Sequence, residues 1–535
     1  MDTKALRQKI LDLAIRGKLV PQDPNDEPAG VLLESIREQK QQMLKEGKLK
    51  KKDIKNDTII FKGEDNLHYE KFQDGTVKCI EDEIPFEVPE GWCWARVRDI
   101  AMVKGGKRLP KGASFSEEIT THAYIRVTDM KNHSVNISNL RYISDEIFSA
   151  IKNYTIAKDD LYVTIAGTIG VVGEIPDKLD GMNLTENAVK ITNIAINKSF
   201  LCIILQTDFV QQQFQDKTHQ VAMPKLALER ILSTLIPICP YVQQLQIVDR
   251  FQICDNFLST IDTEKEELQK IVSLSKYKIL DLAIRGKLVP QDPNDEPASV
   301  ILESIRIEKE ELIKQGKIKR DKKESVIFRG DDNSYYEVIA SKTTNIDDDL
   351  PFELPDGWEW CRLGSIMDIC SSKRVLQSEW KKEGVPFYRA REIVKLSETG
   401  HVDNDLFISE EHYQNLKKDY GIPKSGDLMV SGVGTIGKVY IVCENDKFYY
   451  KDASVLCFQN TYNALYPLYA KLLIDSSFMQ KQMSDNSKGT TVDTITISTA
   501  TTYLCILPPI NEQKRIADKV SQLFSLLDSI AENVN

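Results

Sequence analysis

A long stretch in the middle of the chain carries apolar residues at alternating intervals of four and three. Only Lys265 and Ser275 interrupt the apolar series. This spacing places its members on one side of a helix, as a two-stranded coiled coil requires. We predict a continuous helix of about 40 residues, about 60 Å long at about 1.5 Å per residue. The series is Ile247, Phe251, Cys254, Leu258, Ile261, Lys265, Leu268, Val272, Ser275, Ile279 and Leu282.

The two ends of the chain carry the same pattern in halves. The C-terminal half consists of Ile516, Val520, Leu523, Leu527, Ile530 and Val534, and the N-terminal half of Leu6, Ile10 and Leu13. Together the two ends rebuild the apolar series that the middle holds intact. We predict that the terminal helices pair antiparallel with the central helix, because this arrangement buries both apolar seams.

The chain is a tandem repeat of two copies. Residues 9–29 and residues 278–298 are identical, with the sequence KILDLAIRGKLVPQDPNDEPA. Further along, IPFEVPEGWCWARV is matched by LPFELPDGWEWCRL, and TIAGTIG by SGVGTIG. The stretches from about 105 to 165 and from about 371 to 430 hardly match. The pattern indicates a pseudo-two-fold scaffold that carries two diverged domains.

The identical segment permits two interpretations. After each predicted helix, RGKLVPQDPNDEPA contains the glycine, prolines and Asn/Asp residues that end a helix and form turns, and a second amphipathic helix follows. The segment is then either a structural hairpin that completes the scaffold, or one of two equivalent docking sites for two copies of a partner. The two interpretations are compatible.

The diverged domains are rich in short strand-like runs followed by apolar helices. Examples are AYIRVTDM and NAVKITNIAI in the first copy, and GVPFYRAREI and ASVLCFQN in the second. We predict an α+β protein in which two mixed α/β domains are separated by long antiparallel coiled-coil helices. The expected boundaries are 1–46 for an N-terminal helical segment, 47–84 for a linker with a β-hairpin, 85–240 for the first mixed domain, 241–318 for the central helix and its hairpin, 319–350 for a second linker with a β-hairpin, 351–508 for the second mixed domain and 509–535 for the C-terminal helix.

Composition and charge change this picture little. Of the 535 residues, 41% are hydrophobic and 28% charged, which is typical of a soluble protein with several domains. The net charge of −10 disfavours a nucleic-acid partner only weakly, because local basic clusters matter more than the total. The ten cysteines form no C-x-x-C pair, and neither a signal peptide nor a membrane-spanning apolar run is found. We expect a reduced, cytoplasmic protein without a metal site.

Basic and hydroxyl residues gather at loop-like positions of both diverged domains. Lysine and arginine bind phosphates, and arginine suits the edge of guanine. Solvated surface charge explains any single one of them equally well, but both domains carry basic loops at matching places. The candidate nucleic-acid contacts are Lys104, Lys107, Arg108, Lys111, Arg126, Thr128, Lys131 and Thr168 in the first domain, and Lys373, Arg374, Arg389, Arg391, Ser431, Thr435 and Lys438 in the second.

The stretch GVGTIGKV at residues 432–439 nearly matches a phosphate-binding P-loop. Its last position is Val439 instead of Ser or Thr, and the β-branched residues that follow predict a strand instead of a helix. A tight glycine turn between two strands is the better interpretation. No spacing of the six histidines suggests a metal site, and no methyltransferase or nuclease motif is found.

These features together resemble the specificity subunit of type I restriction–modification systems. The motifs that carry the resemblance are LPFELPDGWEWCRL, GDLMVSGVGTIGKV, LPPINEQKRIADKVSQLFSLLDSI and KILDLAIRGKLVPQDP, and the likeness covers essentially the whole chain. The first copy departs from the pattern, since PYVQQLQIVDRF stands in place of PINEQKRIADKV, and LYVTIAGTIGVV lacks the lysine after its last glycine.

The resemblance implies a non-catalytic DNA-recognition subunit. Each diverged domain would be a target recognition domain that reads one half of a bipartite double-stranded DNA target, and the helices would set the spacer. Two methyltransferase subunits that use S-adenosylmethionine and two motor-nuclease subunits that use ATP and Mg²⁺ would be the partners, and this chain would bind no cofactor itself. Two alternatives stay open on the residues alone: a tandem coiled-coil adaptor without DNA binding, and an enzyme with an unrecognised site.

Overall fold

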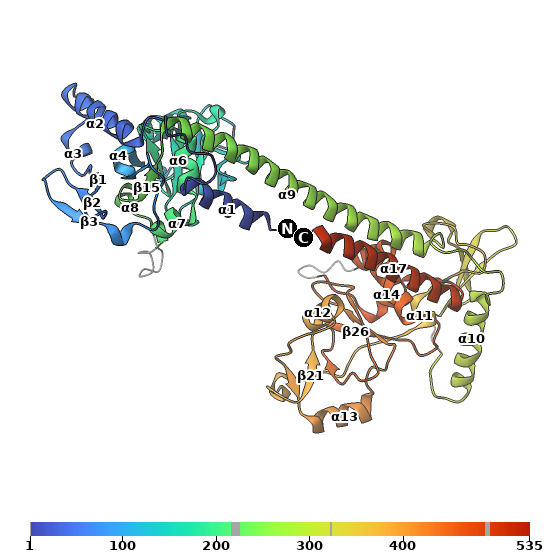
Figure 1. Ribbon diagram of the computed structural model, residues 1–535. Helices are drawn as coiled ribbons and strands as arrows, with labels where there is room; N and C mark the ends of the chain where they lie inside the picture. The colour runs from blue at the N-terminus through green and yellow to red at the C-terminus, as the bar shows by residue number, and fades with distance from the viewer. Residues whose placement is uncertain (1, 216–224, 321–323, 487–492, 535) are drawn as a thin grey trace. The chain divides into compact units, whose positions relative to one another are not determined.

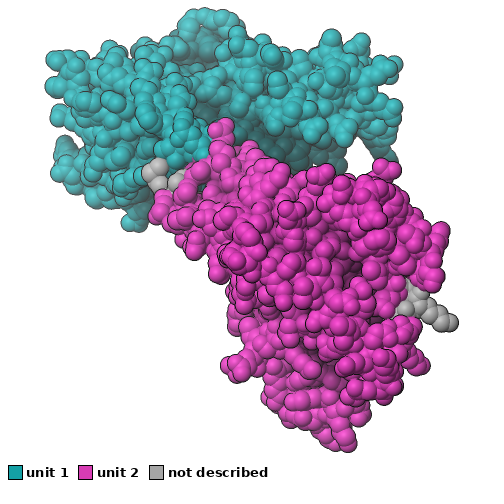
Figure 2. Space-filling view, turned by 90° about the vertical axis from the view of Figure 1, so that its right-hand side faces the viewer, with its two compact units in different colours: residues 1–264 teal, residues 265–535 magenta. Residues whose placement is uncertain are grey.

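The sequence repeat corresponds to two folded units. The computed structural model describes residues 2–215, 225–320, 324–486 and 493–534, so residues 321–323 of the second expected linker lie outside the described residues. The chain divides into unit 1, residues 1–264, and unit 2, residues 265–535, which Figure 2 colours separately. Helix α9 (Tyr241–Ile284) begins in unit 1 and continues into unit 2.

Unit 1 combines three helices at its N-terminus with a mixed domain. Its helices and strands up to α9 are α1 (Thr3–Ile15), α2 (Ala29–Lys45), α3 (Lys51–Ile54), β1 (Ile59–Lys62), β2 (His68–Lys71), β3 (Val77–Cys79), β4 (Cys93–Arg96), α4 (Val97–Ile100), β5 (Met102–Gly105), β6 (Ala123–Ile125), β7 (Met130–Lys131), β8 (Ser134–Val135), β9 (Arg141–Tyr142), α5 (Asp145–Ile151), β10 (Thr155–Ile156), β11 (Leu161–Thr164), β12 (Val172–Glu174), β13 (Met182–Leu184), β14 (Ala188–Thr192), α6 (Lys198–Leu205), α7 (Asp208–Gln215), α8 (Leu228–Leu232) and β15 (Leu235–Ile238).

Unit 2 repeats this order after α9. Its elements are α10 (Ala298–Lys314), β16 (Ser325–Arg329), β17 (Tyr335–Ile339), β18 (Lys342–Asn345), β19 (Glu359–Arg362), α11 (Leu363–Ile366), β20 (Asp368–Cys370), β21 (Val385–Tyr388), α12 (Ala390–Thr399), β22 (Phe407–Ile408), α13 (Glu410–Tyr420), β23 (Leu428–Ser431), β24 (Val439–Ile441), β25 (Tyr449–Tyr450), β26 (Val455–Gln459), α14 (Pro467–Asp475), α15 (Ser477–Asp485), α16 (Ile497–Ala500), β27 (Leu504–Leu507) and α17 (Ile510–Val534).

The main sheets of the two units have the same strand order, whereas the second sheet has four strands, β10-β13-β6-β9, in unit 1 and three, β22-β21-β25, in unit 2. An antiparallel sheet of order β12-β11-β14-β5 in unit 1 corresponds to β24-β23-β26-β20 in unit 2. A three-stranded sheet, β1-β2-β3 or β16-β17-β18, precedes each mixed domain, and an antiparallel pair, β4-β15 or β19-β27, joins the start of that domain to its end. Among the described residues, each unit has one parallel pair of strands, β6 with β13 and β21 with β25. The predicted α+β tandem repeat is confirmed.

The core of each unit lies between these sheets and the helices that follow them. Strand β11 is buried along its whole length because both of its faces are covered, and β23 has the same burial in unit 2. Helix α6 contributes Phe200, Leu201 and Ile204 to the same core as β11. In unit 2, Tyr469, Leu473 and other residues of α14 occupy the corresponding position.

Helix α1 packs against the first part of α9 within unit 1. The Thr3 hydroxyl donates to Asp262 at 2.6 Å, and the Arg7 Nε donates to Asp255 at 2.6 Å. As the residue number rises along α1, the partner's number falls along α9, so the two helices are antiparallel. Figure 1 shows α1 beside this part of α9.

Helix α17 packs against the second part of α9 within unit 2. The Lys276 ammonium lies 2.5 Å from the Asp528 carboxylate and over the ring of Phe524. Ile516 and Val520 of α17 are buried in the core of the unit, against which Ile279 of α9 also packs. The two terminal helices therefore both pair with α9, as predicted (Figure 1).

The predicted seam of α9 follows its buried side. Ile247, Leu258 and Val272 are buried, and the other members of the series are partly buried. Ile10, Leu13, Leu523 and Leu527 are partly buried on the terminal helices. Leu6 and Ile530 are the corrections, because they are 41% and 49% exposed. Near its N-terminus α1 contacts α9 through the polar side chains of Thr3 and Arg7 instead.

The identical segment packs against the opening of the mixed domain, whose sequence is similar in the two copies. Gly17 and Gly286 adopt φ angles of +64° and +63°, and a Cβ on either would lie 2.5 or 2.3 Å from a proline ring, Pro89 or Pro355. The next turn is anchored in the same way in both units, since the Ala29 N–H donates to the Gly91 carbonyl and the Ala298 N–H to the Gly357 carbonyl. These contacts give the segment a structural role in both copies.

Membrane insertion has no support among the helices. Within the described part of the chain, none combines the length and the apolar character needed to cross a bilayer.

Candidate nucleic-acid interface

The glycine-rich stretch of each mixed domain forms a tight turn between two antiparallel strands. In unit 2 the turn joins β23 to β24, and Gly434 and Gly437 have φ angles of +76° and +74°. In unit 1 the turn joins β11 to β12 through Gly167 and Gly170. The stretch that resembles a P-loop therefore leads into a strand, and the prediction of a glycine turn is confirmed.

The same hydrogen bonds hold both turns. The Gln480 amide donates to the Gly437 carbonyl at 3.1 Å, and the Gln211 amide donates to the Gly170 carbonyl at 2.9 Å. Inside the unit 2 turn, the Ser431 hydroxyl donates to the Thr435 carbonyl at 2.6 Å and accepts from the Lys438 N–H at 2.9 Å. Ser431 is completely buried in this role. Ser431 therefore does not belong to the candidate surface, contrary to the prediction.

The tips of these turns are exposed. Thr168 in unit 1 and Thr435 in unit 2 occupy equivalent positions, and both are open to solvent. Lys438 is half-buried, and its backbone N–H closes the turn while its side chain has no ion pair within the described residues. These three positions stay candidates for contact with a nucleic acid backbone.

A basic loop follows β5 in unit 1. Lys104, Lys107, Arg108 and Lys111 are all exposed. The Lys107 ammonium lies over the ring of Tyr154 at 5.4 Å, and the side chain of Arg108 is 77% exposed beside Glu186 at 3.5 Å. Exposed pairs of this kind are weak, so the arginine is available to a stronger anionic partner. The structure brings these four cations together on one loop and its adjoining strand.

The corresponding loop of unit 2 follows β20. Lys373 and Arg374 are exposed, and the Lys373 ammonium lies over the Tyr420 ring at 5.3 Å. The Lys373 N–H donates to the Tyr449 hydroxyl at 3.0 Å, which fixes the start of the loop. Both units thus place a lysine over a tyrosine ring in the same region of the domain.

Arg126 and Arg389 have matching structural roles. Each ends a strand and binds the acidic residue three positions later, Asp129 at 2.7 Å or Glu392 at 2.9 Å, through both its backbone N–H and its guanidinium. This arrangement caps the helical turn that follows. Both arginines stay candidate contacts only through the N–H groups that these bonds leave free. Thr128 and Lys131, close by in unit 1, are exposed.

Arg391 belongs to an ion network in unit 2. Its guanidinium binds the carboxylate of Asp405 at 2.6 Å and also contacts Glu392, and Arg389 binds Asp405 from the other side at 2.6 Å. The hydrogen bonds to Asp405 and Glu392 raise the pKa of Arg391, and the one from Arg391 lowers the pKa of Asp405. Arg391 is 61% exposed, so this network lies at the surface of the domain.

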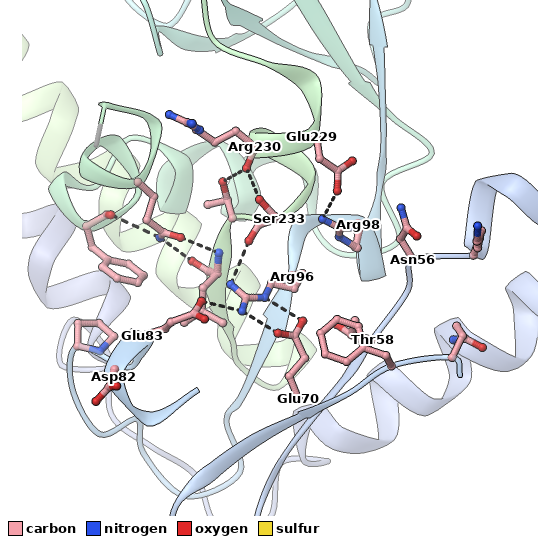
Figure 3. Close-up of a pocket in the computed structure, with 18 of the residues that line it drawn as sticks. Asn56, Thr58, Glu70, Asp82, Glu83, Arg96, Arg98, Glu229, Arg230 and Ser233 are labelled. Atoms are coloured by element: carbon pink, nitrogen blue, oxygen red, sulfur yellow. Dashed lines mark hydrogen bonds and ion pairs between the residues drawn. The ribbon is translucent and has the colours of Figure 1, made fainter. Parts of the chain in front are cut away.

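A different group of charges surrounds a cavity of unit 1 that is about 1310 Å³ in volume. Arg96 binds Glu70 at 2.9 Å, Glu83 at 2.8 Å and the Ser233 carbonyl at 3.0 Å. Figure 3 shows Arg96 among the residues that line this cavity. Burial acts to raise the pKa of Glu70, but the hydrogen bond and charge of Arg96 outweigh it and lower that pKa. None of the predicted nucleic-acid contacts lines this cavity.

This network joins the small sheet to the mixed domain. Glu70 lies on β2 and Arg96 on β4. Unit 2 repeats the pair, since Arg362 on β19 binds Glu337 on β17 at 2.7 Å and the Thr502 carbonyl at 2.9 Å. Neither Arg96 nor Arg362 is among the residues predicted from the sequence. The signal was present, because each copy has an arginine two positions after its second tryptophan and a glutamate in the preceding hairpin.

The site has the chemistry of a binding surface. Exposed lysine, arginine and threonine side chains contact phosphate oxygens and base edges without forming or breaking bonds. In the described residues, no three His, Cys, Asp or Glu side chains are grouped to hold a metal ion.

Sheet topology and exposed basic loops define a class of protein with two domains of one design, each carrying cations that suit an anionic partner. A family model described as "Type I restriction modification DNA specificity domain" matches residues 89–271 and again residues 355–535. The chain therefore belongs to this family, and it is a type I specificity subunit with two target recognition domains. This membership does not support the adaptor alternative.

Known relatives agree with this assignment. The specificity subunit of the type I restriction enzyme EcoAI from Escherichia coli is 27% identical over 582 residues, which cover 98% of this chain and 90% of that protein. The specificity subunit of EcoEI, also from Escherichia coli, is 28% identical over 416 residues, 68% of this chain and 62% of that protein.

Solved structures of type I systems are also similar to this chain. The HsdS subunit from Thermoanaerobacter tengcongensis is 15% identical, with a TM-score of 0.40 and coverage of 85% of this chain and 94% of that one. A chain from a study of complex assembly and conformational transition of the type I R-M system is 14% identical, with a TM-score of 0.48 and coverage of 84% and 94%.

Proposed function

We propose that each unit reads one half of an asymmetric bipartite DNA target. The observation that carries this proposal is a difference in charge between the exposed loops of two similar domains. The loop after β5 and its adjoining strand carry the exposed cations Lys104, Lys107, Arg108 and Lys111, whereas the corresponding loop after β20 carries Lys373 and Arg374. Two domains with a matching central sheet and different exposed loops bind different sequences.

The paired helices set the distance between the two half-sites. Half-sites on one face of B-DNA are about one helical turn, or about 34 Å, apart. A helix of 44 residues, such as α9, is about 66 Å long at about 1.5 Å per residue, so it is long enough for this task. The pairing of α1 and α17 with α9 stiffens α9.

The catalytic steps belong to partner subunits. Two methyltransferase subunits that use S-adenosylmethionine dock on the conserved helical segments, of which the identical residues 9–29 and 278–298 are the candidates. Two motor-nuclease subunits that use ATP and Mg²⁺ join them. This chain binds no cofactor and acts in the cytoplasm, and its recognition of DNA is required for both modification and restriction.

A domain exchange tests the reading function. Residues 105–230 are replaced by the corresponding domain of another family member, and adenine methylation of host DNA is mapped by sequencing with the wild-type and the exchanged chain. We expect one half of the methylated target to change while the other half and the spacer stay the same. A change in both halves contradicts independent reading.

A point variant tests the candidate surface of unit 1. We expect Lys107→Gln combined with Arg108→Gln to reduce the discrimination between target and non-target duplexes at least tenfold in the assembled methyltransferase complex. An unchanged discrimination shows that this loop does not read DNA.

A further inference from the structure

A second basic surface lies outside the candidate reading loops, in the segment that follows α2. Residues 45–55 contain six lysines and only two acidic residues, in a chain whose net charge is −10. All six lysines are exposed. Of the two acidic residues, Glu46 pairs with Lys48 at 2.8 Å, and Asp53 accepts a hydrogen bond from the Lys50 N–H at the start of α3.

The second copy retains this charge although its sequence has changed. Residues 314–324 read KQGKIKRDKKE, against KEGKLKKKDIK for residues 45–55, and again contain six basic and two acidic residues. Among them, Lys314, Lys317, Lys319 and Arg320 are exposed in unit 2, and Arg320 binds Glu310 at 2.6 Å. The two segments differ in sequence but have the same net positive charge. This pattern indicates that the function of the segment depends on its charge and not on particular side chains.

The basic segment of unit 1 lies next to the candidate reading surface. Leu49 and Ile54 line a cavity of about 250 Å³ together with Met102 on β5. Met102 and Lys104 point to the same face of the sheet, because alternate residues of a strand share a face. The strand then leads directly into the loop with Lys107.

The distance between the basic segment and the loop with Lys107 allows both to contact neighbouring parts of one DNA duplex. Lys107 follows Met102 by five positions, so the two residues are at most about 17 Å apart at about 3.4 Å per residue. One turn of B-DNA is about 34 Å long, so the span corresponds to about half a turn. DNA bound at the loop would therefore place its flanking phosphates near residues 45–55.

We propose that residues 45–55 and 314–320 bind the phosphates of DNA that flanks each half-site, without regard to sequence. The proposal deepens the proposed function, since it assumes that the loop after β5 contacts DNA. Lysine is depleted in the core of protein–protein interfaces, whereas protein–DNA interfaces are strongly positive. A row of exposed lysines with few acidic neighbours therefore fits DNA better than an acidic protein.

Salt dependence tests this proposal, because each lost phosphate contact reduces the slope of log K against log salt by about 0.9. The variant is Lys50→Gln, Lys51→Gln and Lys52→Gln, measured in the complex with the methyltransferase subunits on a duplex with long flanks. The matched control is Lys62→Gln, Lys71→Gln and Lys78→Gln, which removes three exposed lysines from the neighbouring small sheet. A third variant replaces residues 50–52 by arginine and keeps the charge.

We expect the glutamine variant at 50–52 to show a shallower salt slope and an equal loss of affinity, about tenfold, for target and non-target duplexes. The recognised sequence stays the same, and the control and arginine variants keep the wild-type slope. Shortening the flanks should reproduce the effect in the wild type and have little further effect in the variant.

Three results overturn the proposal. The first is an unchanged slope, the second is an equal change in the control, and the third is lost assembly with the partner subunits at an unchanged slope, which identifies the segment as a protein contact. The Lys107 and Arg108 variant is measured by its discrimination between target and non-target duplexes, and the lysine variant by its salt slope. Unchanged discrimination therefore contradicts the proposed function, whereas an unchanged salt slope contradicts only the flanking contact.

Discussion

Residue by residue, the identical segment is held by the opening of the mixed domain. The Trp92 indole donates to Gln243 at 2.9 Å and to Gln22 at 3.0 Å. In unit 2 the Trp358 indole donates to Glu512 at 2.9 Å, and Gln291 donates to the same carboxylate. The segment, the tryptophan motif and the start of α9 or α17 therefore meet at one point in each unit. This contact is consistent with the close sequence match of the segment and of the tryptophan motif between the two copies.

The glycine of this segment gives the first prediction. We expect Gly286→Ala to destabilise unit 2 by about 3 kcal/mol, because the added Cβ meets the rigid ring of Pro355 at a φ of +63°. The control Gly316→Ala has a similar φ of +69° and open space around it, so it should cost only about 1 kcal/mol. Urea unfolding followed by hydrogen exchange of residues 278–298 measures both, and equal costs contradict the packing described here.

The carboxylate of Glu512 gives a prediction about pH. Burial raises its pKa, although the hydrogen bonds from Trp358 and Gln291 oppose this. A carboxyl with a raised pKa in the folded state contributes stability below its unfolded pKa, about 4.3, and loses it as the pH rises through the folded value. Glu512→Gln should therefore flatten the fall in the stability of unit 2 above pH 4. Gln243 already fills this place in unit 1, so the variant should fold.

Removing the indole N–H of Trp358, which donates to Glu512, tests the same site. Trp358→Phe leaves the Glu512 carboxylate with one donor fewer, and we expect a loss of about 1–3 kcal/mol at pH 7. Combined with Glu512→Gln, the loss should be smaller, because no charge is left buried. Additive effects of the two changes would contradict a direct bond between the side chains.

For single residues, the sequence identifies which side chains are basic or polar, but it does not show whether each one is exposed for binding or stabilises the fold. Exposed Lys107 and Arg108 are where the basic loop suggests, but Ser431 is buried, and Arg126 and Arg389 cap helical turns. Whether a polar side chain faces solvent or closes a turn depends on neighbours that are distant in the sequence. Arg96 is the clearest case, since its partner Ser233 lies 137 positions away.

At the scale of elements, the apolar seam of α9 separates residues that pack from residues that do not. We expect Leu258→Ala to destabilise the pairing of α1 with α9 by about 2–3 kcal/mol, because Leu258 is 6% exposed. Its neighbour Phe257 is 70% exposed, so Phe257→Ala should change stability by at most about 0.5 kcal/mol. Hydrogen exchange of residues 3–15 compares the two, and equal protection would show that the seam does not hold α1.

Helix pairing was predictable from the sequence because a heptad series is a strong and local signal. The split of the second helix between Leu13 and Ile516 follows from the repeat alone. The sheet order was not predictable, because β5 pairs with β14 across more than 80 intervening residues and no local pattern encodes that register. The exposure of Leu6 and Ile530 was missed for a similar reason, since burial near a helix end depends on its partner.

At the scale of the whole molecule, one chain carries two versions of the same reader. The exposed basic loop of unit 1 and its adjoining strand carry Lys104, Lys107, Arg108 and Lys111, and the matching loop of unit 2 carries Lys373 and Arg374. A symmetric target would require equal surfaces, so two unlike surfaces predict an asymmetric one. The helices keep the same seam in both copies, as a common spacer requires.

The length of the helices is the quantity that tests this account most directly. One heptad is inserted after Leu258 and a matching heptad after Leu527, which preserves the seam and adds about 10 Å at about 1.5 Å per residue. The methylated target of the resulting complex is then mapped in host DNA. We predict that both half-sites are unchanged and that the spacer between them is longer. Methylation of the original target with its original spacer would contradict the account.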